Sequence, residues 1–137
     1  MSNDNRLDLT AFSERIATLR THVADNVVGQ SLPVHLLLTA LMADGHVLLE
    51  GVPGVAKTLL AKTLARLVRA DFRRVQFTPD LMPTDVLGTS IFNLGTQQFD
   101  FHPGPVFTQV LLVDEINRAP AKTQAALFEV MEERQVT

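Results

Sequence analysis

Residues 51–58 could hold the phosphates of a nucleotide, because they read Gly-Val-Pro-Gly-Val-Ala-Lys-Thr and follow an apolar run. A triphosphate needs backbone N–H groups that approach it closely and a mobile cation, which two glycines and Lys57 can supply. The Thr58 hydroxyl could ligate Mg²⁺, and the helix that follows would direct its N-terminal dipole at the same phosphates. Ala56 stands where the strict G-x-x-x-x-G-K-[ST] pattern has glycine. The predicted nucleotide contacts of this segment are Gly51, Val52, Pro53, Gly54, Val55, Ala56, Lys57, Thr58 and Leu59.

An acidic pair, Asp114 and Glu115, follows the apolar run at residues 110–113. Such a run is typical of a strand buried on both faces in a parallel sheet, and ligands bind at the carboxyl ends of such strands. Asp114 is therefore predicted to ligate Mg²⁺, and Glu115 to orient a water that attacks the γ-phosphate. The alternative is a strand that ends in a solvated acidic turn. The phosphate loop upstream favours the catalytic interpretation, in which Lys57 and Glu115 are the catalytic residues.

Length and composition are those of one globular domain, with 137 residues, 46% hydrophobic and 20% charged, and a net charge of −3. No apolar run approaches the roughly 20 residues of a membrane span. The first residues lack the apolar stretch of a secretory signal, and without cysteine the chain has no disulfide or thiolate metal site. We therefore expect a cytoplasmic protein. Its mild acidity argues against nucleic acid as the main partner.

Hydrophobic periodicity predicts alternating helices and strands. Helices are expected over residues 9–26, between Ser31 and Gly45, over 57–70 and over 121–134, with an irregular or short helical piece at 78–88. Buried strands are expected at 46–50, 72–77 and 110–114, and a hairpin at 90–93 and 98–102. This order predicts a three-layer α/β/α fold with a mainly parallel sheet.

Three segments form a recognisable pattern. They are the phosphate loop with Ala56 before its lysine, residues 77–88 (Phe-Thr-Pro-Asp-Leu-Met-Pro-Thr-Asp-Val-Leu-Gly) and residues 114–137. The last segment reads Asp-Glu-Ile-Asn-Arg-Ala-Pro-Ala-Lys-Thr-Gln-Ala-Ala-Leu-Phe-Glu-Val-Met-Glu-Glu-Arg-Gln-Val-Thr. Together they resemble the MoxR family of AAA+ ATPases, over the chain from about Phe12 onward. The resemblance implies a P-loop NTPase (AAA+) fold that binds ATP and Mg²⁺ and hydrolyses the ATP.

Further roles follow from the resemblance. Val28, Gly29 and Gln30 match the connector that lines the adenine pocket of AAA+ proteins, and the hairpin around Gly95 matches an insertion that faces the central pore of a ring. Family members are similar to chaperones that remodel or mature partner proteins, often ones with von Willebrand factor A-type domains. A homo-oligomeric ring acting on such a client is therefore expected, with no membrane span.

The resemblance also divides the chain into an N-terminal helical segment, residues 1–26, and a partial AAA+ core, residues 27–137. AAA+ proteins continue past the position of Thr137 into further strands, a sensor residue, arginine fingers and a helical lid. One of those strands lies between the first and the third, so two strand edges are expected to lack a partner. We therefore expect an incomplete sheet and a chain that alone hydrolyses ATP poorly.

Two other functions stay open. One is a nucleotide-binding fragment without catalysis, which would fit the missing sensor and finger residues. The other is a nucleic-acid motor of the same superfamily, which would use a basic stretch along the third helix and its exit. Such a stretch is also typical of a solvated helix face. Its members are Lys62, Arg66, Arg69, Arg73 and Arg74.

Other residues near the predicted site have two interpretations each. Gln76 and Thr78 either restrain Glu115 until a partner engages or make ordinary hydrogen bonds at a strand end. Asn117 and Arg118 either contact the nucleotide or an adjoining subunit, or form a loop with an ion pair to an acid. Three hairpin-region aromatics either stack on a threaded substrate or, more simply, pack on the domain, namely Phe99, Phe101 and Phe107. The four histidines show no metal-ligand spacing.

Overall fold

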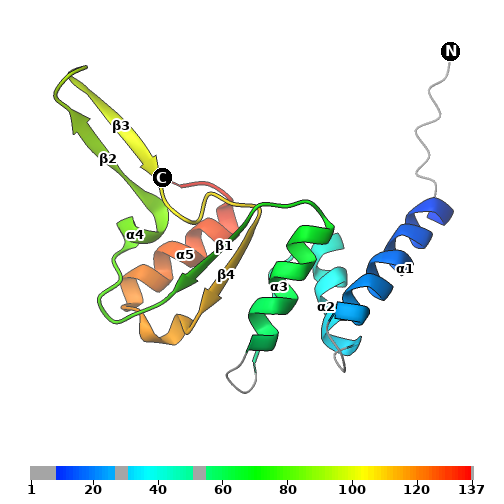
Figure 1. Ribbon diagram of the computed structural model, residues 1–137. Helices are drawn as coiled ribbons and strands as arrows, with labels where there is room; N and C mark the ends of the chain where they lie inside the picture. Colours follow the sequence, from blue (N-terminus) through cyan, green and yellow to red (C-terminus); the bar gives the residue numbers. More distant parts are fainter. Residues whose placement is uncertain (1–8, 27–30, 51–54, 137) are drawn as a thin grey trace, which may run out of the picture. The chain divides into compact units, whose positions relative to one another are not determined.

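The computed structural model describes residues 9–26, 31–50 and 55–136 (Figure 1). The chain divides into two compact units, Met1–Leu67 and Val68–Thr137. Among the described residues, no helix is both long enough and apolar enough to cross a membrane. The predicted boundary between an N-terminal segment 1–26 and a core 27–137 stays a prediction.

The first unit is helical. It contains α1 (Leu9–Asn26), α2 (Ser31–Met42) and α3 (Val55–Leu67), and α1 contacts both of the other helices. The buried side chains of α2 and α3 recur every three or four residues, as expected for the apolar face of a helix. They are Val34, Leu37, Leu38, Leu60, Ala61, Leu64 and Ala65. The three predicted helices are therefore confirmed, although α3 ends three residues before the predicted end at Ala70.

The strand predicted at residues 46–50 is wrong for this structure. The described part of the chain has no strand hydrogen-bonded to this segment, and its backbone adopts no regular structure. Two of its apolar side chains are exposed, Val47 at 42% and Leu48 at 76%. A strand exists only through pairing of its backbone N–H and C=O groups with a neighbour. No such strand pairing is assigned to residues 46–50 within the described part of the chain.

A parallel pair of strands organises the second unit. The strands β1 (Phe72–Gln76) and β4 (Val110–Asp114) pair residue for residue, from Phe72 opposite Val110 to Gln76 opposite Asp114. Both strands were predicted, and the parallel pairing is as expected. Since the strands run in the same direction, their carboxyl ends lie side by side.

One face of this sheet packs on the last helix, α5 (Ala121–Glu133), and on the short helix α4 (Pro83–Leu87) (Figure 1). Alternate residues of each strand point to the same face, so Val75, Leu111 and Val113 all reach the buried cluster there. The centre of the cluster consists of Phe77, Val86, Ala119 and Leu127. The buried Thr123 hydroxyl donates a 2.7 Å hydrogen bond to the carbonyl of Leu81, which ties α5 to the segment before α4.

An antiparallel hairpin of β2 (Gly88–Asn93) and β3 (Gln98–Pro103) projects away from the sheet (Figure 1). It confirms the predicted hairpin. At its base, Gly88 has φ +102°, and a Cβ there would lie 2.4 Å from the carbonyl oxygen of His102, so only glycine fits. Packing on the domain explains the aromatic residues only in part. Phe101 lies edge-to-face on Phe107, but Phe99 is 72% exposed and contacts Phe92 within the hairpin.

Leu127→Ala should lower the free energy of unfolding by about 2–5 kcal/mol, because it removes a fully buried side chain from the centre of the cluster. Phe128→Ala is the matched control on the same helix. Its side chain is 51% exposed, so the loss should be about 1 kcal/mol or less. Urea unfolding followed by circular dichroism measures both values. Equal losses in the two variants would show that α5 does not pack as described.

Candidate functional site

The carboxyl ends of β1 and β4 form a polar edge of the sheet. Gln76 lies directly opposite Asp114, and the backbone N–H of Phe77 donates a 2.9 Å hydrogen bond to the carbonyl of Asp114. In α/β proteins with parallel strands this edge is where ligands bind. The structure therefore places Asp114 where the sequence predicts a metal ligand.

Arg74 binds the Asp114 carboxylate from the neighbouring strand. Its Nε lies 2.6 Å from Oδ2 of Asp114, and its Nη2 donates a 3.4 Å hydrogen bond to Oε1 of Gln76. The aspartate side chain is 21% exposed, whereas the arginine side chain is 51% exposed. One oxygen of the predicted metal ligand is thus held by a positive charge, and the three side chains form a network on one face of the sheet.

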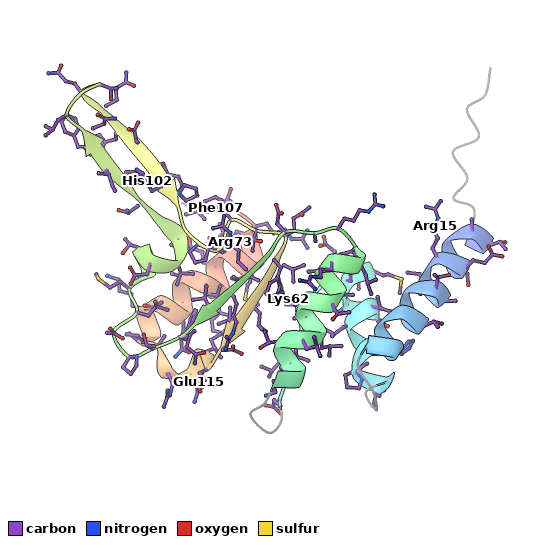
Figure 2. All side chains as sticks on the ribbon, in the orientation of Figure 1. Arg15, Lys62, Arg73, His102, Phe107 and Glu115 are labelled. Carbon is purple, nitrogen blue, oxygen red and sulfur yellow. The ribbon has the colours of Figure 1, made fainter. Side chains whose placement is uncertain are left out.

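Glu115 begins the turn after β4 with a left-handed backbone, φ 55° and ψ 43°. This conformation is uncommon for residues other than glycine and costs free energy unless the surroundings enforce it. The 3₁₀ turn η1 (Ile116–Arg118) follows, and the Arg118 backbone N–H donates a 2.8 Å hydrogen bond to the Glu115 carbonyl. Figure 2 shows the Glu115 side chain at this turn, beyond the end of β4.

The Glu115 carboxylate pairs with Arg118. Nη1 of Arg118 lies 2.8 Å from Oε2 of Glu115, which confirms the ion-pair interpretation of Arg118. The two side chains are 60% and 48% exposed, for the arginine and the glutamate respectively. Exposed pairs three residues apart contribute only about 0.2–1 kcal/mol. Glu115 can therefore leave this partner at little cost.

No hydrogen bond joins Gln76 or Thr78 to Glu115 in the described part of the chain. Gln76 accepts its hydrogen bond from Arg74. The Thr78 side chain hydrogen-bonds the Asp80 carboxylate, and this bond, with the Asp80 backbone N–H, lowers the pKa of that carboxyl. The interpretation as ordinary strand-end hydrogen bonding is thus the one that the structure favours.

Arg74 belongs to the basic stretch expected from the sequence, whereas the structure places it beside Asp114 as a site residue. The structure separates that stretch, because Lys62 and Arg66 belong to α3 whereas Arg73 and Arg74 belong to β1. The signal that could have found Arg74 is its strand position, two residues before Gln76 and therefore on the same face of the sheet.

The predicted phosphate loop lies partly outside the described residues. This holds for Gly51, Val52, Pro53 and Gly54, and likewise for Val28, Gly29 and Gln30, so their roles stay predictions. The helix α3 begins at Val55 and includes Ala56, and its first turn carries the partly buried Lys57 and Thr58. Leu59 is 44% exposed. A lysine and a threonine in the first turn lie at the positive end of the helix dipole, where anions bind.

The oxygen ligands offered by Thr58 and Asp114 fit Mg²⁺, which prefers hydroxyl, carboxylate and phosphate oxygens. No cluster of three or more histidine, cysteine, aspartate or glutamate side chains occurs among the described residues. A hydroxyl and a carboxylate are ligand types that Mg²⁺ takes together with substrate phosphates and water.

Comparison with known proteins gives the family. Residues 46–137 match the family described as "ATPase family associated with various cellular activities (AAA)". The chain belongs to this AAA family. The match includes both the predicted phosphate loop and the acidic pair.

The AAA chain is also similar to individual proteins. It is 59% identical over 111 residues to Chaperone MoxR1 of Mycobacterium tuberculosis, covering 81% of this chain and 29% of that protein. It is 53% identical over 116 residues to the uncharacterized protein YeaC of Bacillus subtilis, covering 85% of this chain and 36% of that protein. A crystal structure of a candidate ATPase from Cytophaga hutchinsonii superposes with a TM-score of 0.74 at 45% identity, covering 96% of this chain and 42% of that one.

These similarities confirm the predicted AAA fold and the resemblance to MoxR proteins. The AAA chain spans less than half the length of each of the three proteins.

Glu115→Val should lower the free energy of unfolding by about 1–2 kcal/mol relative to Glu115→Gln, because a β-branched residue is strained in the left-handed conformation. Both variants lose the charge pair with Arg118, so the difference between their free energies of unfolding reports the cost of the left-handed backbone. Urea unfolding of the two proteins gives the comparison. Equal stabilities would mean that this residue is not left-handed in solution.

Proposed function

We propose that this chain binds ATP with Mg²⁺ and hydrolyses its γ-phosphate, as part of a chaperone-like ATPase of MoxR type. The observation that carries the proposal is the acidic pair at the carboxyl end of a parallel strand. Asp114 ends β4, and Glu115 begins the turn beyond it. Family membership and the first turn of α3, with Lys57 and Thr58, support it.

In the proposed mechanism each polar side chain has one task. Lys57 and the loop amides stabilise charge that develops on the phosphates, which is the largest contribution in phosphoryl transfer. Thr58 and Asp114 would hold Mg²⁺, which neutralises phosphate charge when bound. Glu115 accepts a hydrogen bond from the attacking water and orients it toward phosphorus. Its weak pairing with Arg118 allows the carboxylate to turn to that water.

The biological role of the whole protein is proposed by analogy. The relative MoxR1 is named a chaperone, so we propose that ATP turnover in a homo-oligomeric ring remodels or matures a client protein. A client with a von Willebrand factor A-type domain is the expected partner. A cytoplasmic location is expected as well.

Action on nucleic acid is the weaker proposal. It depends on the basic stretch, and the structure distributes that stretch over α3 and β1 and engages Arg74 with Asp114. A nucleotide-binding protein without catalysis is the other alternative. The effect of replacing Glu115 on ATP hydrolysis distinguishes it from an ATPase.

Lys57→Ala should abolish detectable binding of Mg·ATP, because the side chain that reaches the β- and γ-phosphates is removed. Lys62→Ala is the matched control, since it removes an exposed lysine from the same helix. Fluorescence titration with a labelled ATP analogue measures both affinities. If Lys57→Ala bound as tightly as Lys62→Ala, residues 51–58 would not be a phosphate loop.

Glu115→Gln should keep ATP affinity and slow hydrolysis by about 100-fold or more, since the amide cannot act as a base toward water. The measurement is phosphate release under single-turnover conditions. Glu132→Gln, an exposed glutamate on α5, serves as control and should hydrolyse like the parent. Equal rates in all three proteins would remove Glu115 from the mechanism.

A further inference from the structure

One ion pair crosses between the two strands at the predicted metal ligand. Arg74 and Asp114 are 40 residues apart in sequence, and they meet because the parallel register places them on one face, two positions apart. Neither side chain belongs to a loop. The contact is therefore fixed by the backbone hydrogen bonds of the sheet, unlike the local pair of Glu115 with Arg118.

The arginine occupies one carboxylate oxygen and leaves the other available. Nε of Arg74 binds Oδ2 of Asp114, and no hydrogen bond to Oδ1 involves the residues that the structure describes. On its other side Arg74 is held by Gln76, the residue directly opposite Asp114. An arginine held at two points is oriented, and it orients its partner through a short charge-assisted hydrogen bond.

We infer that Arg74 is a positioning residue for Mg²⁺ binding: it holds Asp114 through Oδ2 so that Oδ1 is presented to the metal. The inference rests on the proposed function. Carboxylates that ligate metals are commonly hydrogen-bonded themselves, and removal of such a partner typically costs about 10–100-fold in metal affinity or activity. A rotating carboxylate would lose entropy each time it binds the ion, whereas a carboxylate held by Arg74 has already lost it.

The positive charge of Arg74 opposes this effect, because it repels a nearby Mg²⁺. Arg74 is half exposed, so solvent screens its charge, whereas its hydrogen bond to the more sheltered Asp114 is short. We therefore expect orientation to outweigh repulsion. Weaker Mg²⁺ binding after removal of Arg74 would mean that orientation outweighs repulsion, and tighter binding would mean the reverse.

The test is calorimetric titration of ATP into the whole chain, once with Mg²⁺ and once with EDTA. The variants are Arg74→Gln and Arg74→Met, which remove the charge and keep much of the side-chain length. Arg73→Gln is the matched control, because it removes the adjacent arginine of β1, which alternates to the opposite face. Thermal unfolding of each protein is recorded in parallel.

The expected result is that Mg²⁺ tightens ATP binding in the parent and in Arg73→Gln, and that both Arg74 variants lose about 10-fold or more of this tightening. Affinity in EDTA stays unchanged. The inference is overturned if the Arg74 variants keep or increase the effect of Mg²⁺, or if they lose affinity equally in EDTA, which indicates a merely structural role. Absence of ATP binding in the parent itself overturns the proposed function and, with it, the inference.

Discussion

The parallel pairing of β1 with β4 is the constraint on which the second unit depends. Its register sends one set of alternate side chains into the cluster around Phe77 and Leu127, and it brings Gln76 beside Asp114 at the polar edge. A shift by one residue would reverse both faces. Burial of the core and placement of the acidic pair therefore both depend on the same strand pairing, and the site cannot form without the sheet.

The two carboxylates of the acidic pair are held in different ways, and the difference matches their proposed roles. Asp114 is bound across strands by Arg74, in a contact that the sheet keeps in place. Glu115 is bound by Arg118 within one exposed turn, in a contact worth little free energy. A metal ligand benefits from a fixed orientation, whereas a carboxylate that orients water must be able to leave its ion pair and turn toward that water.

Local patterns in the sequence predicted most of the fold. The apolar run before Asp114, the hairpin around Gly95 and the last helix all form as expected, because each is specified by its own periodicity and turn residues. Residues 46–50 form no strand, since strand formation depends on a partner and not on the segment alone. The left-handed backbone of Glu115 could not be predicted, because it depends on tertiary structure. The strand position of Arg74 indicates its face of the sheet, but its pairing with Asp114 depends on the register of β1 against β4.

The most direct test of one shared nucleotide site is a two-dimensional NMR titration of the chain with Mg²⁺ and a non-hydrolysable ATP analogue. Residues 51–59 and the pair Asp114–Glu115 belong to different units of the structure, so their responses are independent observations. We predict that the amide signals of both segments shift together and report the same dissociation constant. Shifts confined to one segment, or none in either, would contradict the proposal that the phosphate loop and the acidic pair act on one ATP.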